Sequence, residues 1–287
     1  LLEARQAIAR EAARLNIKGV TSDDVILTSG GSEGITMALG ALINKGENVL
    51  TPKPGYPLYN AVVNYLDGEL NEYELDEDNE WQPDIDDMRN KINDKTKGIV
   101  IINPNNPTGA LYTKETLLKV IDLAKEFDLP ILSDETYDKI LFDDEFKFHA
   151  VGSLTDEVSV ITFNTLSKNY LCPGWRVGWT IFSGPKDKIG EYEEAVKQLA
   201  RARLCIIHPM QYAVKPALEG PQDHIKEMID KLKIRRDLTY QRLNSIKGIS
   251  CVKPRGAFYA FPKIELPIES DKEFVLNLVK QEGPLFV

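Results

Sequence analysis

The feature that most constrains the fold is an alternation of short β-rich runs with helical segments. The runs rich in β-branched or aromatic residues and bounded by turn formers are 25–29, 48–52, 98–104, 129–134, 158–164 and 177–182. Between them lie helical patterns such as 114–127, where apolar residues recur on one face: Leu117, Leu118, Ile121 and Ala124. This alternation predicts an α/β fold with a mainly parallel sheet and flanking helices.

The pattern changes after Pro185, where long helical segments over 189–203 and 209–245 replace the alternation. Strand signals return in 251–263. We therefore predict an N-terminal helix over 1–14, a large domain over 15–220, and a smaller α+β domain over 221–287 that begins near Pro221.

The composition narrows the classes of partner. The net charge of −9 repels nucleic acid and anionic lipid, so an anionic small ligand needs a local positive pocket. No apolar run approaches the roughly 20 residues of a membrane helix, and the first ten residues carry charges unlike a signal peptide. We expect a cytoplasmic protein that binds neither membrane nor nucleic acid. The three cysteines and three histidines have no disulfide-framework or metal-ligand spacing, so we predict no metal.

Two glycine-containing motifs follow predicted strands. TSGGSEG, 28–34, places paired glycines and Ser32 before a helix, where free amides and the helix dipole favour an anion, although a plain glycine turn is the alternative. NPNNPTG, 103–109, is a rigid turn at the carboxyl end of a strong strand. It would hold the Asn106 amide towards a phenolate-like oxygen, unless Asn106 is only a turn former.

Two further strands run directly into polar side chains. LPILSDETYDKI delivers Asp134 and, three residues later, Tyr137; a buried carboxylate needs a partner, and helix capping is the alternative. ITFNTLSKNYLCPGWRVGW delivers Lys168, with Arg176 eight positions on. Partial desolvation would lower the pKa of Lys168, as Schiff-base formation requires, and the Arg176 fork suits a phosphate. Individually these residues could be surface charges, but together they describe one site.

These motifs, with PGYPLY at 54–59, resemble the fold-type I enzymes of pyridoxal 5′-phosphate (PLP), and among them the class I/II aminotransferases. Their order and approximate spacing agree over nearly the whole chain. The resemblance implies PLP as cofactor, held by Lys168 as a Schiff base. It also implies phosphate contacts from Gly31, Ser32, the Glu33 amide, Thr165 and Arg176, and ring contacts from Tyr56, Asn106, Asp134 and Tyr137. Lys168, Asp134 and Tyr137 are the implied catalytic residues.

The implied reaction moves an amino group between an L-amino acid and a 2-oxo acid, with Lys168 as the base that moves the α-proton. The wording of the motifs is similar to alanine aminotransferases, which suggests alanine and 2-oxoglutarate as substrates, and the resemblance implies a homodimer. A PLP lyase or aminocyclopropane-carboxylate synthase-like enzyme remains an alternative, because the same cofactor residues serve elimination. A non-catalytic PLP-fold regulatory module is another, although no basic helix-turn-helix segment is visible.

The resemblance also concerns the parts that bind substrate. In relatives, an N-terminal arm reaches the site and an arginine near the C-terminus holds the substrate carboxylate, and we expect both to lie outside this sequence. The small domain is then incomplete, and no substrate-carboxylate arginine is assigned. Arg255 stands where relatives vary, and Ile207 replaces an asparagine common among them.

Overall fold

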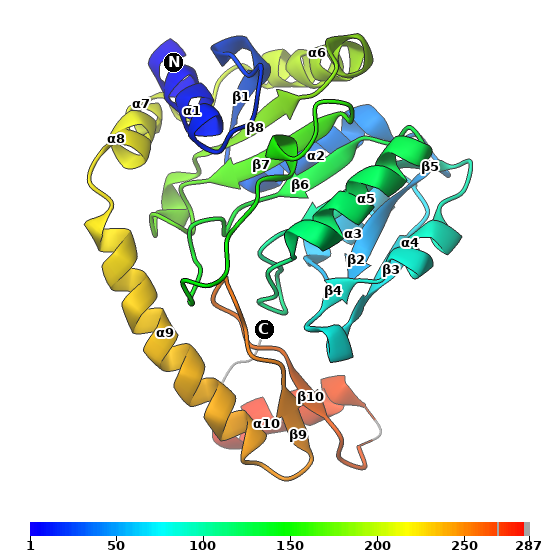
Figure 1. The fold of residues 1–287 in the computed structure, drawn as a ribbon, viewed down its shortest axis with the longest axis vertical. Helices are drawn as coiled ribbons and strands as arrows, with labels where there is room; N and C mark the ends of the chain where they lie inside the picture. Colours follow the sequence, from blue (N-terminus) through cyan, green and yellow to red (C-terminus); the bar gives the residue numbers. More distant parts are fainter. Residues whose placement is uncertain (269, 284–287) are drawn as a thin grey trace.

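The computed structural model describes residues 1–268 and 270–283. Its centre is an eight-stranded sheet in the order β1-β8-β7-β6-β5-β2-β3-β4, with helices on both faces (Figure 1). The strands are β1 (Val25–Thr28), β2 (Asn48–Lys53), β3 (Asn71–Asp76), β4 (Gln82–Pro83), β5 (Thr96–Ile102), β6 (Ile131–Asp134), β7 (Val160–Thr165) and β8 (Gly178–Ser183). The predicted α/β class is confirmed, and each of the six predicted runs overlaps a strand.

Strand direction brings several strand ends to one edge of the sheet. The pairs β3·β2, β2·β5, β5·β6 and β6·β7 are parallel. β8 is antiparallel to both β7 and β1, so β1 runs in the same direction as β7. β3 and β4 were not predicted from the sequence. The sequence of β3, NEYELD, is mostly polar, because only Tyr73 and Leu75 of this strand are buried.

Helices cover the two faces of the sheet with separate apolar cores. One face packs against α2 (Gly31–Leu42), α3 (Pro57–Tyr65) and α6 (Lys186–Arg203). The other packs against α1 (Leu2–Arg14), α4 (Ile85–Lys91) and α5 (Lys114–Glu126). Because the central strands are buried on both faces, their apolar residues do not alternate strictly with polar ones, as in residues 99–102 of β5.

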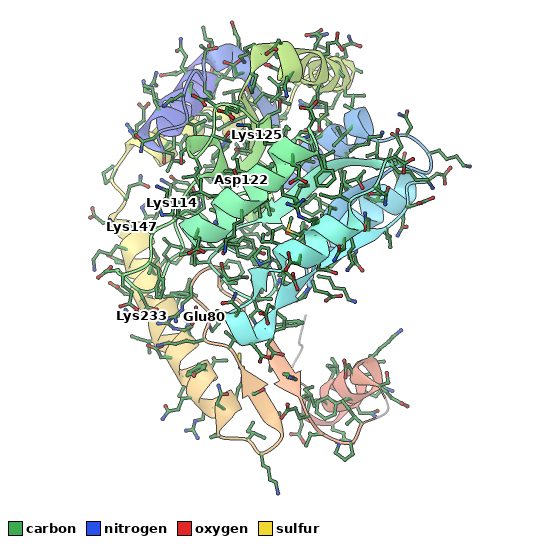
Figure 2. All side chains as sticks on the ribbon, turned by 45° about the vertical axis from the view of Figure 1, so that its right-hand side comes forward. Glu80, Lys114, Asp122, Lys125, Lys147 and Lys233 are labelled. Atoms are coloured by element: carbon green, nitrogen blue, oxygen red, sulfur yellow. The ribbon has the colours of Figure 1, made fainter. Side chains whose placement is uncertain are left out.

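Helix α5 shows how the amphipathic pattern is used. Its buried face consists of Leu117, Val120, Ile121, Leu123 and Ala124. Leu118, which the sequence placed on this face, is 38% exposed, so that assignment was wrong. It lies one position after Leu117, about 100° around the helix, and therefore turns away from the sheet. Lys114, Asp122 and Lys125, labelled in Figure 2, are also exposed on this helix.

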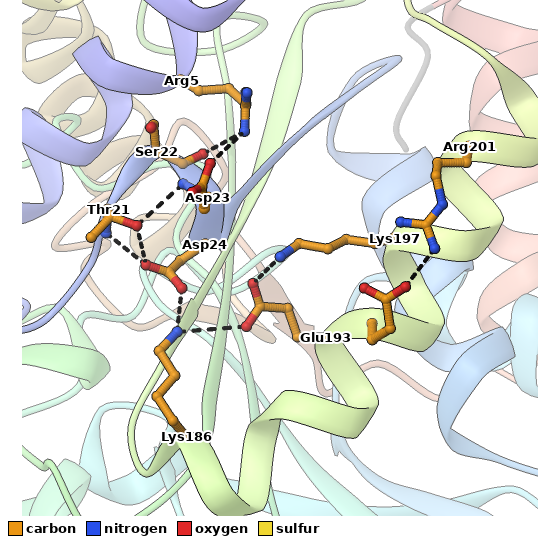
Figure 3. A network of polar contacts seen from close by, with 10 residues as sticks. Arg5, Thr21, Ser22, Asp23, Asp24, Lys186, Glu193, Lys197 and Arg201 are labelled. Carbon is orange, nitrogen blue, oxygen red and sulfur yellow. Dashed lines mark hydrogen bonds and ion pairs between the residues drawn. The ribbon is translucent and has the colours of Figure 1, made fainter.

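A polar network fixes α6 to the start of β1 (Figure 3). Asp24 accepts hydrogen bonds from the backbone N–H and hydroxyl of Thr21, at 2.7 and 2.8 Å, and pairs with Lys186 in the first turn of α6. Lys186 also lies 3.5 Å from Glu193, which Lys197 contacts at 2.7 Å. Asp24 is 7% and Glu193 5% exposed, so both buried carboxylates are compensated by lysines.

The C-terminal part consists of α7 (His208–Gln211), α8 (Val214–Glu219), α9 (Asp223–Asn244), β9 (Ile249–Cys251), β10 (Pro262–Ile264) and α10 (Asp271–Glu282). The continuous helical stretch expected over 209–245 is therefore divided. Gly220 is extended, with ψ of −177°, as expected for a residue that precedes proline, and Pro221 lies between α8 and α9. A second domain over 221–287, residues 269 and 284–287 of which lie outside the described part, remains our prediction.

The chain between β9 and β10 returns to the large sheet. The backbone N–H groups of Arg255 and Gly256 both donate to the Gly109 carbonyl, at 2.8 and 2.9 Å, and Ala257 donates to the Ile140 carbonyl at 3.0 Å. These bonds bring residues 255–259 against the loops that follow β5 and β6.

Candidate active site

The edge where β1, β5, β6 and β7 end is also where β8 begins, because β8 alone among these strands runs in the opposite direction. The polar motifs predicted from the sequence follow these strands directly. Open α/β sheets bind ligands at the carboxyl ends of their strands. The topology thus brings five segments distant in sequence to one place.

A cavity that is open to solvent lies at this edge. Nine of the predicted site residues line it: Gly31, Ser32, Tyr56, Asn106, Asp134, Tyr137, Thr165, Lys168 and Arg176. The other lining residues are Ile35, Ile102, Thr136, Ser167, Pro173 and Tyr259. Of the predicted set, only Glu33 does not line the cavity with the rest.

One end of the cavity is positively charged. The Arg176 guanidinium donates to the Ser32 hydroxyl at 3.1 Å and to the Ser29 carbonyl at 3.2 Å. Helix α2 begins at Gly31, so its first amides have no partner within the helix and point towards this end. An arginine beside a helix N-terminus is a site for an anion such as a phosphate group.

Two glycines allow this close arrangement. Gly30 has a φ of +75°, and a Cβ there would lie 2.3 Å from Arg176 Nη2. A Cβ on Gly178 would lie 2.5 Å from the Gly30 carbonyl carbon, which is backbone and cannot move away independently. The motifs TSGG and RVG therefore require glycine where the last residues of β1 meet the first residues of β8.

Glu33 has a structural contact on the far side of this turn. Its carboxylate accepts from the Ser29 N–H at 2.7 Å and lies 3.2 Å from Arg203 Nε. Arg203 also donates to the Leu27 carbonyl at 2.9 Å. The side chain of Glu33 thus braces the loop, while the N–H, to which the sequence assigned the binding role, lies in the first turn of α2.

Lys168 lies just beyond β7, in a partly buried position. Burial lowers the pKa of its ammonium group below the ordinary value; the Asp134 carboxylate opposes this shift and the Arg176 guanidinium adds to it. The amine lies 5.9 Å from the centroid of the Tyr137 ring and 5.6 Å from that of Phe258. An amine with a lowered pKa is available in the neutral, nucleophilic form.

Asp134 ends β6 and is 6% exposed. Its carboxylate accepts from the Tyr59 hydroxyl at 3.3 Å and from the Thr136 N–H at 3.2 Å. Burial raises the pKa of Asp134, although these hydrogen bonds and nearby Lys168 act in the opposite direction. Sequence reasoning missed Tyr59 as a partner. The sequence signal for this contact was that Tyr59, the second tyrosine of PGYPLY, lies one helical turn after Tyr56.

The Tyr137 hydroxyl lies 2.7 Å from the hydroxyl of Tyr259, which sequence reasoning also missed. Burial raises the pKa of Tyr137 well above its ordinary value, and Tyr259 adds to this effect. Tyr259 reaches the cavity because residues 255–257 are bonded to the loops after β5 and β6. The motif GAFYAF gave an aromatic signal, but nothing in the sequence placed it beside the sheet.

Asn106 lies in a turn held by its neighbours. Asn105 is fully buried, donates to the Tyr112 hydroxyl at 3.1 Å and accepts from the N–H and hydroxyl of Thr108 at 3.1 and 2.8 Å. The peptide bond between Asn106 and Pro107 is cis. Asn106 lines the cavity from this turn.

Arg255 lies away from this cavity. Its guanidinium pairs with Glu80 at 2.7 Å and stacks over the Phe146 ring with the central carbon 4.3 Å from the centroid. Glu80, labelled in Figure 2, belongs to the exposed turn before β4. The cavity is lined by Arg176 and by no other arginine among the described residues. The described residues also contain no cluster of metal-ligating side chains.

Comparisons with known proteins agree with the site. Residues 1–285 match the family model described as aminotransferase class I and II. The glutamate-pyruvate aminotransferase AlaA of Escherichia coli (strain K12) is 43% identical over 293 residues, which cover 100% of this chain and 72% of that protein. The alanine aminotransferase of Mycobacterium tuberculosis (strain ATCC 25618 / H37Rv) is 44% identical over 266 residues, 91% of this chain and 62% of that protein.

Solved structures give the same result. The alanine aminotransferase from Pyrococcus furiosus superimposes with a TM-score of 0.96 at 48% identity, covering 100% of this chain and 73% of that chain. The fold is thus that of the fold-type I PLP-dependent enzymes, as the sequence predicted. Because family model, relatives and structures all match across the strands that build the cavity, the chain belongs to the class I and II aminotransferases.

Proposed function

We propose that the protein transfers an amino group between L-alanine and a 2-oxo acid, with glutamate and 2-oxoglutarate as the second pair. The relatives that support this are named glutamate-pyruvate and alanine aminotransferases, at 43% to 48% identity. The observation that carries the proposal is the meeting of Lys168, Asp134 and Arg176 around one cavity. None of these three charges is adjacent to another in sequence.

The cavity fits PLP by the chemistry of its lining residues. A phosphate group would bind at the Arg176 end, with Ser32, Thr165 and the first amides of α2. The Thr165 hydroxyl lies 2.8 Å from the Ser167 hydroxyl and donates to the Val177 carbonyl at 2.7 Å, so it would exchange the latter bond to donate to a phosphate. Gly31 leaves room, since a Cβ there would meet only the Thr136 hydroxyl, at 3.8 Å. Lys168 is the amine available to bind the cofactor aldehyde.

The remaining residues suit an aromatic ring with a basic nitrogen and a hydroxyl. Asp134, buried at the end of β6, is the carboxylate that would pair with the protonated nitrogen. Asn106 and Tyr137 offer hydrogen-bonding groups for the ring hydroxyl, and Tyr56 offers a flat surface for stacking. When bound, PLP supplies an electron sink for the charge left on the substrate after loss of its α-proton.

Lys168 then acts as a base. When not bound to the cofactor, the Lys168 amine would remove the α-proton of the substrate and deliver it to a second carbon atom. The lowered pKa of Lys168 makes its neutral form more accessible than that of an exposed lysine, which favours its action as a base. The rings of Tyr137 and Phe258 limit the water around this amine.

We further propose that the protein is a cytoplasmic homodimer. Large apolar side chains are exposed in two segments near the site: Leu171, Trp175, Leu204, Ile207 and Tyr212. Such exposure is typical of a surface covered by a partner. The three cysteines are free, which suits a reducing compartment. None of the helices in the described part of the chain is long and apolar enough to span a membrane. Sedimentation of the purified protein tests the dimer, and a monomer at micromolar concentration would contradict it.

The test of the reaction is a donor panel with purified protein, PLP and 2-oxoglutarate. We expect alanine to yield pyruvate and glutamate in equal amounts. Borohydride reduction should trap PLP on Lys168, and Lys168→Ala should abolish both trapping and turnover. Release of ammonia instead of glutamate would indicate a lyase, and PLP bound without turnover of any donor would indicate a regulatory module.

A further inference from the structure

Beneath the cavity floor, one carboxylate joins the two segments that carry the proposed catalytic residues. Asp138 follows Tyr137 directly. Its Oδ1 accepts a hydrogen bond from Asn169 Nδ2 at 2.6 Å, and the Asn164 side chain lines the same buried hollow as this carboxylate and lowers its pKa. We call Asp138, Asn164 and Asn169 the Asp138 cluster. Its members are 7%, 7% and 1% exposed, so solvent does not compete for this bond.

The positions of the two asparagines in the chain indicate which segment the cluster holds. Asn164 and Asn169 lie at the two ends of the short segment that contains Thr165, Ser167 and Lys168. The Asp138 carboxylate therefore holds one end of that segment through its hydrogen bond with Asn169, and it lies beside the other end at Asn164. On its other side the segment is bonded towards β8, where Leu166 N–H donates to the Val177 carbonyl at 3.0 Å. Asp138 supplies the corresponding connection to the segment after β6.

Stability alone does not explain a buried carboxylate at this place. Burial raises the pKa of Asp138, which shows that its charged form is destabilised there. In addition, Asn169 Oδ1 is buried and has no hydrogen-bond partner among the described residues. Well-packed apolar residues in place of buried charged groups are often as stable or more stable. Directional bonds, unlike apolar packing, fix the relative position of two segments.

We propose that the Asp138 cluster positions Lys168 relative to Asp134, and so aligns the amine that binds PLP and moves the substrate proton. This inference rests on the proposed function. None of its three residues lines the cavity, so the cluster acts through the backbone of the Lys168 segment. Because misplacement of a reacting group by about 1 Å can cost roughly 100-fold in rate, a small shift of this segment is enough to matter.

The test uses three variants and a matched control. Asn169→Leu removes the donor. The isosteric Asp138→Asn weakens the bond from Asn169, because a neutral amide oxygen replaces the carboxylate, and it serves if the leucine variant does not fold. The double variant Asp138→Asn/Asn169→Asp restores a donor–acceptor pair with its direction reversed. The control, Thr96→Val, removes a buried bond from the Thr96 hydroxyl to Asn48 Oδ1, 2.9 Å long, at the opposite end of β5.

Three quantities are measured: the rate of borohydride-trappable PLP attachment to Lys168, kcat and KM for the amino donor, and Tm. We expect Asn169→Leu to slow both attachment and kcat by about 10- to 100-fold, with KM nearly unchanged. Asp138→Asn should show an intermediate loss, and the double variant should regain most of the rate. Thr96→Val should lower Tm to a similar degree while leaving both rates unchanged.

Two results would overturn the proposal: rates in Asn169→Leu no lower than in Thr96→Val, or a double variant no faster than the single ones. A wild-type protein that traps PLP on Lys168 without transaminating any donor contradicts the proposed function alone. In that case, the rates of PLP attachment in the variants still test whether the Asp138 cluster positions Lys168.

Discussion

Replacing Asp134 by asparagine separates the charge of this side chain from its shape. The carboxylate accepts from the Tyr59 hydroxyl at 3.3 Å and from the Thr136 N–H at 3.2 Å. The amide oxygen of an asparagine can still accept from the Thr136 N–H, and its NH₂ group can donate to the Tyr59 oxygen. Asp134→Asn therefore removes one negative charge and leaves the local packing in place.

The expected loss is in rate. Removing one preorganised electrostatic partner typically lowers kcat by about 10²- to 10³-fold, or ~2.7–4 kcal/mol. The contacts of Arg176 with Ser32 and Ser29 lie at the other end of the cavity and are not disturbed. We therefore expect the Kd for PLP to change by less than about tenfold, because charge-assisted phosphate bonds of ~1.5–3 kcal/mol each are retained.

Without PLP the same variant should be no less stable than the wild type. Burial raises the pKa of Asp134 above its ordinary 3.8. Protonated Asp134 therefore contributes to the stability of the folded protein. This contribution is fully present below pH 3.8 and is lost as pH rises through the raised pKa of the folded state. An asparagine does not titrate, so at pH 7 the Tm of the PLP-free variant should equal or exceed that of the wild type.

The assay combines single-turnover absorbance kinetics with alanine, fluorescence titration of PLP, and thermal unfolding. The matched comparison is Arg176→Gln, which should show the opposite pattern of weak binding and a nearly normal rate at saturation. A kcat of Asp134→Asn within about threefold of wild type at saturating PLP would refute an electronic role. A parallel loss of PLP affinity and Tm would mean that Asp134 is only structural.

Three further predictions follow from contacts around the cavity. Arg176→Gln should raise the Kd for PLP by about 10- to 100-fold, since each charge-assisted bond is worth ~1.5–3 kcal/mol; an unchanged titration would exclude Arg176 as the phosphate ligand. Gly178→Ala should lower the free energy of unfolding in urea by about 1–3 kcal/mol, because its Cβ would lie 2.5 Å from the Gly30 backbone; wild-type stability would contradict this. Burial raises the pKa of Glu135 from 4.5 to about 8, so its stabilising contribution is complete below pH 4.5 and lost above pH 8; Glu135→Gln should abolish that decline, and parallel stability curves would refute it.

The sequence predicted those parts of the fold that depend on local pattern. Buried parallel strands such as β5 and β7 are recognisable because both faces are apolar, and the helix over 114–127 because its apolar residues recur at helical spacing. β3 was missed because a strand near the edge of the sheet needs few apolar residues. The division of 209–245 was missed although its signal, Gly-Pro at 220–221, was present.

In the candidate site, too, some residues could be predicted from the sequence and others could not. Lys168, Asp134 and Arg176 were predictable because each follows or precedes a strand at one sheet edge, and their roles stay predictions. Tyr59 and Tyr259 were not, because a hydroxyl-to-carboxylate or hydroxyl-to-hydroxyl contact depends on helix placement and on the return of a distant segment. Charge and strand position can be read along the chain, whereas side-chain partners depend on tertiary packing.

The place of β8 between β7 and β1 has a consequence for the order of folding. β7 and β8 are adjacent in sequence and can pair as soon as both are synthesised. β1 is at the edge of the sheet and pairs with β8, with Thr28 opposite Gly178, 150 residues later. At a synthesis rate of roughly 5–20 residues per second, β8 is synthesised about 8–30 s after β1. Ser32 and Arg176 meet only when β1 docks, so PLP binding during synthesis would report the closure of the sheet.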